Sequence, residues 1–214
     1  AGNLGLNNCY QADENYPLVV YAKDFDSNES VDAILGCYAK ESLENNVEKK
    51  LFPVHFWDEL NSQSPRFRKQ FSRYRHYGKT TMDELFTETD LKDALILKAN
   101  YFKSSYIKNN GNGRFEMIPL PMPAQVGPVN GMVVEDINDD GNLDVLTVGN
   151  DFGNEVFAGR YDAFTGLILT GDGKGNFKAL SSAQSGFLVD GDVKALAKLF
   201  RSNGEELFIA TRNR

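Results

Sequence analysis

Short apolar runs separated by polar turns make up most of the chain outside one central stretch. The turns are rich in Gly, Asn and Asp, which favour tight reversals of the backbone. Apolar runs bounded by such turns are typical of strands in sheets that are covered on both faces. The pattern therefore predicts a mainly β fold. We expect strands at 17–22, 32–39, 94–99, 131–135, 144–149, 166–170 and 206–211.

Residues 40–92 lack this pattern and carry helix signals instead. Ser64–Pro65 has the form of an N-cap followed by proline at the first helical position. Thr81–Glu84 has the form of a capping box, in which the first and last side chains bind each other's backbone amides. Three aromatic residues recur at helical spacing between them, namely Phe67, Phe71 and Tyr74. We expect a helical insertion that lies outside the sheets and whose removal leaves the β fold intact.

The β-rich parts of the chain resemble one another at a fixed spacing. Residues 104–115 align with 165–177, and residues 133–150 align with 196–213. The repeat is therefore about 62 residues long, and it reads as strand, acidic turn, strand and a second strand pair. We expect the first half of repeat one at 1–39, the insertion at 40–92, the second half of repeat one and a link at 93–130, repeat two at 131–190, and a degenerate third repeat at 191–214.

The composition fits a soluble domain with a sizeable core. Hydrophobic residues make up 41% of the 214 residues and include 15 Phe and 9 Tyr. The net charge of −7 argues against nucleic acid as a partner. No apolar run approaches the roughly 18 residues of a membrane-spanning helix. The two cysteines, Cys9 and Cys37, fit either one disulfide bond or two buried thiols.

The acidic turn of repeat two has the ligand pattern of a calcium loop. Counted from Asp136, the side chains at positions 1, 3, 5 and 9 all carry oxygen, and position 6 is a glycine that permits a sharp bend. A backbone carbonyl at position 7 completes a flexible cage of hard oxygen ligands, which suits Ca²⁺ and not Zn²⁺. The expected ligands are Asp136, Asn138, Asp140, Asn142 through its carbonyl, and Asp144.

Repeat one has the same pattern from Asp24 onward, with Glu29 where the glycine is wanted. A non-glycine residue in the left-handed conformation costs about 1–2 kcal/mol. We therefore expect this loop to bind calcium more weakly than the loop of repeat two. Its expected ligands are Asp24, Asp26, Asn28, Ser30 through its carbonyl, and Asp32.

The third copy has lost every carboxylate but keeps Gly204 at the bend. Its positions 1, 3, 5 and 9 are Leu199, Arg201, Asn203 and Leu207. We expect it to keep the hairpin and to bind no metal. An EF-hand is excluded for the other two copies, because its position 12 needs Glu and here holds Thr147 or Leu35, and because the flanks are β-rich. A solvated acidic turn without metal is the remaining alternative.

Two recurring strings carry a family resemblance. "DFDSNESVD" and "DINDDGNLD", each followed by a strand, and the hairpin strings "NNGNGRF" and "GDGKGNF" resemble FG-GAP/VCBS repeats of integrin α-like β-propellers. Other strings, such as "EVFAGRYDAFTGLIL", resemble bacterial surface proteins that carry such repeats beside ASPIC/UnbV-type segments. The resemblance implies four-stranded blades, with a structural Ca²⁺ in the turn between the first strands. Glu29 departs from the pattern.

The resemblance also bears on completeness. Propellers have roughly four to eight blades, so two repeats and a third hairpin cannot close a ring. We expect a partial propeller that is part of a longer protein or that pairs its open edges with another copy.

The leading functional hypothesis is a non-enzymatic, calcium-braced binding or scaffold module of a larger extracellular, cell-surface or periplasmic protein. Its partner would be a protein or a glycan, since extracellular calcium is abundant enough to fill modest sites. A glycan-active enzyme is an alternative, but the patterned carboxylates are assigned to metal. His55 and His76 both lie in the insertion, and no G-x-S-x-G, H-E-x-x-H or phosphate-loop motif is present. We therefore expect no catalysis.

A basic stretch in the insertion gives a further alternative, binding of a polyanion or glycan. Residues 66–79 contain six cations interleaved with aromatic residues, and no acid. The simpler interpretation is a solvated helix face whose aromatic residues pack inward. The cations are Arg66, Arg68, Lys69, Arg73, Arg75 and Lys79.

Overall fold

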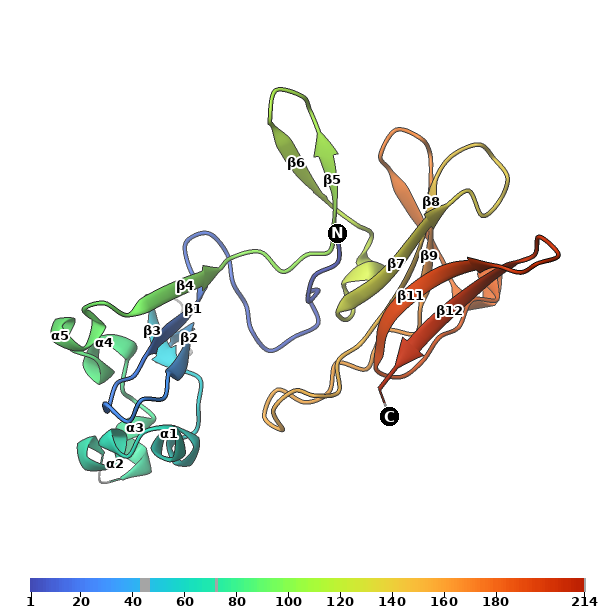
Figure 1. The fold of residues 1–214 in the computed structure, drawn as a ribbon. Coiled ribbons are helices and arrows are strands. Elements are labelled where there is room, and N and C mark those ends of the chain that lie inside the picture. Colours follow the sequence, from blue (N-terminus) through green and yellow to red (C-terminus); the bar gives the residue numbers. More distant parts are fainter. Residues whose placement is uncertain (43–46, 72, 214) are drawn as a thin grey trace. The chain divides into compact units, whose positions relative to one another are not determined.

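The computed structural model describes residues 1–42, 47–71 and 73–213. These residues form two compact units (Figure 1). Tyr10–Tyr101 make up one unit, which we call the small lobe, and Ala1–Cys9 with Phe102–Arg214 make up the large lobe. The described residues form twelve strands in four antiparallel sheets with a few short helices, so the predicted mainly β class is confirmed. None of these sheets closes on itself.

The small lobe contains one four-stranded antiparallel sheet in the order β3-β2-β1-β4. The strands are β1 (Leu18–Lys23), β2 (Asp32–Lys40), β3 (Lys49–Pro53) and β4 (Leu95–Ala99). Alternating positions of β1 and β2 are buried, as in a sheet with one covered face. Val19 and Ile34, from β1 and β2, are 2% and 0% exposed.

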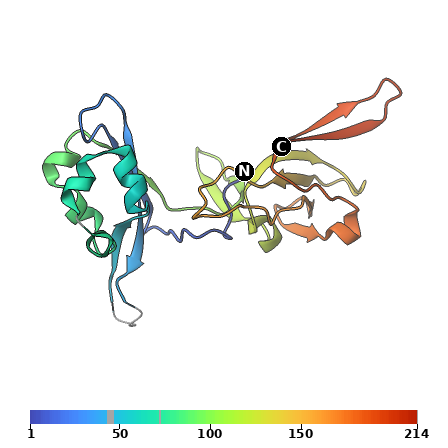
Figure 2. The ribbon, with the colours of Figure 1, turned by 90° about the horizontal axis from the view of Figure 1, so that it is seen from below.

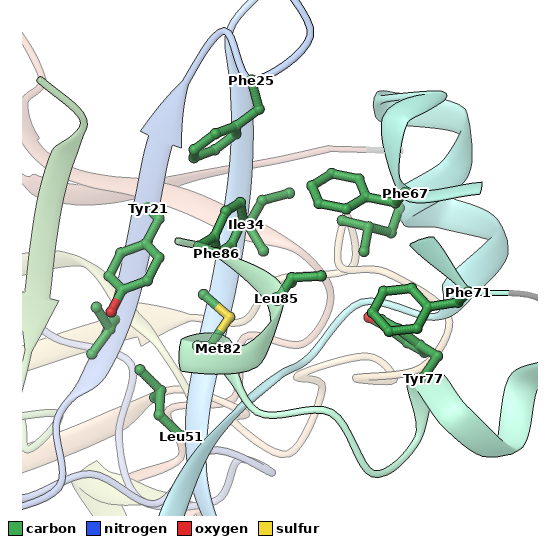
Figure 3. Close-up of a cluster of buried hydrophobic side chains, with 12 residues drawn as sticks. Tyr21, Phe25, Ile34, Leu51, Phe67, Phe71, Tyr77, Met82, Leu85 and Phe86 are labelled. Carbon is green, nitrogen blue, oxygen red and sulfur yellow. The ribbon is translucent and has the colours of Figure 1, made fainter. Parts of the chain in front are cut away.

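Five short helices supply the layer that covers this face. They are α1 (Trp57–Gln63), α2 (Arg66–Gln70), α3 (Tyr74–Tyr77), α4 (Met82–Leu85) and α5 (Glu88–Leu91). Figure 3 shows Phe67, Met82 and Phe86 gathered beside Ile34 of the sheet. The expected capping box is formed, because the carboxylate of Glu84 accepts the backbone amide of Thr81 at 2.9 Å.

The insertion therefore does not lie outside the sheets, and that prediction is wrong. Residues 40–92 contain edge strand β3, and their helices supply most of the large buried side chains of the small lobe. The physical reason is that the apolar face of β1 and β2 needs a covering layer, and the nearest one in sequence is this segment. We now expect its removal to unfold the small lobe.

The large lobe is built on a second antiparallel sheet in the order β10-β9-β8-β7. Its strands are β7 (Val129–Glu135), β8 (Asp144–Gly149), β9 (Leu167–Gly171) and β10 (Phe177–Leu180). Successive residues of β9 enter different clusters, with Leu167 and Leu169 in one and Ile168 in the other. The sheet is therefore buried on both faces, as its apolar strands predict.

Two hairpins and two short helices complete the large lobe. The hairpins are β5 (Ser105–Asn109) with β6 (Phe115–Pro119), and β11 (Val193–Phe200) with β12 (Glu206–Arg212). The helices are the 3₁₀ turn η1 (Met122–Gln125) and α6 (Ser182–Ser185). Figure 2 shows the β11–β12 hairpin as a separate ribbon beside the four-stranded sheet. Leu120 joins one apolar cluster and Val193 the other, so each face is covered by a different segment.

The repeat boundaries need a correction at 93–130. The β5–β6 hairpin was expected to complete the sheet of repeat one, but it forms its own two-stranded sheet in the large lobe. The edge of β2 that it would have used is occupied by β3, and β4 pairs with β1 instead. The seven strands predicted from the apolar runs are all present, with ends within about two residues. Among the described helices, none is long and apolar enough to cross a bilayer.

Candidate metal sites

The acidic turn between β1 and β2, Asp24–Asp32, is held by its two end carboxylates, and we call it loop 1. The Asp24 carboxylate accepts the amides of Asn28 at 3.0 Å and of Glu29 at 2.8 Å. At the other end, Asp32 Oδ2 accepts the amide of Phe25 at 3.1 Å. These bonds draw the middle of the loop back over its ends. Oxygen side chains are thereby turned toward a common centre.

The turn between β7 and β8, Asp136–Asp144, has the same bonds, and we call it loop 2. The Asp136 carboxylate accepts the amides of Asp140 at 3.1 Å and of Gly141 at 2.8 Å. Asp144 Oδ2 accepts the amide of Ile137 at 3.1 Å. Each bond joins the same two positions in both loops, so the carboxylates at positions 1 and 9 have the same role.

The backbone conformations also match. Position 4 is left-handed in both loops, with φ of 61° at Ser27 and 58° at Asp139. Position 6 is left-handed as well, with φ of 69° at Glu29 and 86° at Gly141. Loop 1 therefore adopts the glycine conformation without a glycine. The strain expected at Glu29 is present, but it does not change the shape of the loop.

Carboxylates converge most closely in loop 1. Oxygens of Asp24, Asp26 and Asp32 all lie within 4.8 Å of one another. Asp26 Oδ2 accepts the hydroxyl of Ser64 at 2.9 Å, while Asp26 Oδ1 is buried and has no hydrogen-bond partner. A buried carboxylate oxygen without a partner is costly, and three carboxylates this close together repel one another. A cation among them would remove both costs.

The polar side chains of loop 2 are bonded within the loop and to the neighbouring strand β9. Asn138 Nδ2 donates to Asp140 Oδ2 at 3.0 Å, and the other Asp140 oxygen accepts the amide of Asn142 at 2.8 Å. Asp144 is fully buried, and its Oδ1 accepts the amide of Gly171 at 2.9 Å. Among the described residues, loop 1 holds the single triad of converging carboxylates. The carboxylate geometry thus favours loop 1, whereas the sequence favoured loop 2 because of its glycine.

The pKa directions follow from these surroundings. Burial raises the pKa of Asp32, and the neighbouring charges of Asp26 and Asp24 add to this effect, against the amide of Phe25. Burial also acts to raise the pKa of Asp24, but bonds from the backbone amides of loop 1 outweigh it and lower the value. The amide of Asn142 and the side chain of Asn138 lower the pKa of Asp140. Loop 1 thus contains one carboxylate that resists ionisation while no cation is present.

The third copy forms a shorter turn. Leu199 pairs directly with Leu207, and the strands continue to the pair Phe200–Glu206. The residues that would be ligands 1 and 9 are therefore part of the β ladder and not of a loop. Gly204 keeps its left-handed φ of 86°, and Arg201 forms an ion pair with Glu205 at 2.9 Å.

The basic stretch is divided between the core and solvent. Phe67, Phe71 and Tyr77 are buried, as the simpler interpretation predicts, but Tyr74 is 51% exposed and departs from it. Arg66 forms an ion pair with Asp90 at 2.6 Å, and this contact lowers the pKa of the Asp90 carboxyl. The remaining cations are exposed, namely Arg68, Lys69, Arg73, Arg75 and Lys79.

The sequence did not indicate two hydrogen-bond partners of the acidic loops, Ser64 and Gly171. Ser64 was expected to cap a helix, but α2 begins at Arg66 after Pro65, and the Ser64 hydroxyl binds Asp26. The amide of Gly171 binds Asp144 across the sheet. Both contacts join residues far apart in the chain, so no local pattern indicates them. Cys9 and Cys37 form no disulfide bond with each other, and Cys9 is exposed, so neither one disulfide nor two buried thiols is found.

Comparisons with protein-family models, with curated proteins and with solved structures found no match. The function is therefore argued from the two loops and their surroundings.

Proposed function

We propose that the protein is a non-enzymatic, calcium-braced binding or scaffold module of a larger extracellular or cell-surface protein. The observation that carries the proposal is the close agreement of loop 1 and loop 2 in hydrogen bonding and backbone conformation. The partnerless, buried oxygen of Asp26 supports a cation in loop 1. Two loops far apart in sequence share end carboxylates that bind the same backbone amides.

Calcium fits this donor set better than other ions. The side-chain donors of both loops are carboxylate and amide oxygens, with no nitrogen or sulfur ligand. Hard oxygen ligands on a flexible loop suit Ca²⁺, whereas Mg²⁺ demands a tighter octahedron and gives up its water reluctantly. The bound ion would neutralise the carboxylates and hold each strand pair at its turn, which is a structural role.

We further propose that the sheet β7–β10 is one blade of an FG-GAP/VCBS-type propeller. Support comes from its four antiparallel strands in sequential order, with the acidic loop between the first two. Both of its faces are apolar and covered, as the inner surfaces between neighbouring blades would be. The ring itself would require further blades from a longer chain or from another copy.

A scaffold role is favoured over catalysis by how the reactive groups are used. The patterned carboxylates bind loop amides, which holds them in place for a metal. His55 Nε2 accepts the amide of Leu35 at 3.1 Å, so this nitrogen is engaged in the small lobe. An extracellular location would provide enough Ca²⁺ to fill both loops permanently.

Calorimetric titration of the chelated protein with Ca²⁺ and Mg²⁺ tests the metal, together with thermal unfolding in each ion. Because Ca²⁺ binds the folded loop, a hundredfold excess over Kd should stabilise by about 2.7 kcal/mol per site. Mg²⁺ should restore less stability than Ca²⁺ after chelation. Absence of Ca²⁺ binding at millimolar concentrations would contradict the proposal.

A further inference from the structure

The small lobe carries a concentration of positive charge that the calcium proposal does not use. Residues 66–79 hold six cations and no acid in a chain whose net charge is −7. Among the described residues, Arg66 is the member of this set that forms an ion pair. The other five are exposed, and within the part of the chain that the structure describes none has an acidic partner at ion-pair distance: Arg68, Lys69, Arg73, Arg75 and Lys79.

Packing in the core anchors the backbone segments that carry these cations. Phe67 of α2 and Tyr77 of α3 are buried in the core of the small lobe, and Phe71 lies between the two helices. The rings of Phe71 and Tyr77 meet edge to face, with centroids 5.5 Å apart. Because Phe67, Phe71 and Tyr77 face the core, the basic side chains lie toward solvent, together with the exposed Tyr74. Like charges gathered in this way create a local positive potential that attracts an anion.

Three basic side chains share one hollow. Arg75, His76 and Lys79 line a surface hollow of about 510 Å³, which Phe71, Thr80 and Glu84 complete. The hollow is shallow and open to solvent. Glu84 in its wall accepts the amide of Thr81 at 2.9 Å, which lowers the pKa of the carboxyl, so one negative charge stands beside the cations. The cations Arg75 and Lys79 outnumber this carboxylate, so the hollow has a net positive charge.

We propose that this hollow binds an acidic sugar residue of an anionic polysaccharide. Arg75 and Lys79 would hold the carboxylate or sulfate through charge-assisted hydrogen bonds. This site goes beyond the calcium-braced scaffold and does not depend on a metal.

The charge of the rest of the chain favours a polysaccharide over nucleic acid. Removing the six cations of residues 66–79 from the net charge of −7 leaves −13 for the remainder. Duplex DNA carries one charge per about 1.7 Å, so its flanks would be repelled by that remainder. A polysaccharide with roughly one charge per sugar would suffer less repulsion while still filling the hollow.

The test uses the full chain in the presence of chelator, so that its outcome is independent of calcium. Binding of a sulfated heparin oligosaccharide and of an oligogalacturonate is measured by calorimetry, at about 50 mM and about 200 mM salt. The test variant is Arg75→Ala with Lys79→Ala. The matched control is Lys174→Ala with Lys178→Ala, which removes the same charge from exposed positions of the large lobe. All four side chains are exposed, and thermal unfolding verifies that both variants fold.

At least one of the two oligosaccharides should bind, and Arg75→Ala with Lys79→Ala should weaken it about tenfold or more and flatten its salt dependence. The control should change affinity by less than about twofold. Equal losses in the two variants would show attraction by net charge alone and overturn the site. Absence of binding to both oligosaccharides would also overturn it, and tighter binding of a single-stranded oligonucleotide of equal charge would overturn the assignment to a glycan.

Discussion

Loop 1 and loop 2 adopt the same backbone although one has Glu29 where the other has Gly141. The common cause is the pair of end carboxylates, which bind the same amides in both loops. Glycine at position 6 therefore makes the turn less costly, but it is not what determines its shape. The oxygen pattern is the stronger predictor of this loop.

The two loops differ in what anchors them. Phe25 of loop 1 is buried in the helix-covered core, with its ring centroid 4.5 Å from that of Phe86. Its counterpart in loop 2, Ile137, is only partly buried against its cluster. Loop 2 is held instead by Asp144, which is bonded across the sheet to Gly171. Loop 1 thus depends on the core, and loop 2 depends on hydrogen bonds.

The largest expected effect on stability comes from replacing the apolar residue at position 2 of each loop, Phe25 or Ile137. Phe25→Ala should lower the free energy of unfolding of the small lobe by about 3–5 kcal/mol, because it empties a packed aromatic site. Ile137→Ala should cost the large lobe about half as much, because its side chain is already partly exposed. Calorimetric unfolding measures both costs, and the fluorescence of Trp57, the single tryptophan, reports the small lobe in a denaturant titration. Equal costs would show that the two loops have the same anchoring.

At position 9 the order of the two lobes should reverse, with the larger loss of stability in the large lobe. In chelator, Asp144→Ala leaves the amides of Ile137 and Gly171 without their acceptor, at about 1–3 kcal/mol each. Asp32→Ala leaves one such amide, that of Phe25, and also removes the repulsion from neighbouring carboxylates. Asp144→Ala should therefore be the more destabilising of the two variants. Hydrogen exchange at the Gly171 amide should accelerate in it, and unchanged exchange would contradict the assigned bond.

A reciprocal exchange at position 6 isolates the backbone strain. Glu29→Gly should stabilise the small lobe by about 1 kcal/mol, and Gly141→Glu should destabilise the large lobe by a similar amount. A Cβ atom at Gly141 would meet nothing within 4 Å, so the cost there is conformational. Thermal unfolding measures both changes. Opposite signs are required, and a neutral result in either variant would refute the strain.

The smallest effect is in the pH dependence of loop 1. The folded-state pKa of Asp32 is raised, so its ionisation destabilises the calcium-free small lobe at all pH values above that pKa. This penalty is relieved as the pH falls through the folded pKa toward the unfolded value of about 3.9. Ca²⁺ needs the ionised form, so calcium-induced stabilisation should shrink over the same interval. Asp32→Asn serves as the control, and an identical pH profile in that variant would exclude Asp32 as the cause.

The sequence predicted local features well. The apolar runs gave the strands, and the capping box at Thr81–Glu84 gave the start of α4. Both depend on neighbouring residues and on the periodicity of one element. The alternate oxygen side chains of each loop likewise predicted a turn that the end carboxylates hold closed.

What the sequence could not predict is which segments would pair or pack over long distances. Strand β3 pairs with the edge of β2 where the repeat pattern predicted the β5–β6 hairpin, because the insertion supplies a strand of its own. The hydroxyl of Ser64 does not cap a helix but donates to Asp26, and the amide of Gly171 donates to Asp144 across the sheet. Which loop brings its carboxylates closer together depends on such contacts, and not on the residue at position 6.

The central claim is that both loops hold Ca²⁺, and site-resolved calorimetry of the chelated protein tests it most directly. The wild-type chain should show two sites, with loop 1 filling first, because loop 2 must break the Asn138–Asp140 hydrogen bond at a cost of about 1 kcal/mol. Asp32→Ala should remove the tighter site and Asp140→Ala the weaker one, while Asn203→Ala in the third hairpin should leave both. Absence of calcium binding at millimolar concentrations, or survival of two sites in the two Asp variants, would contradict the account.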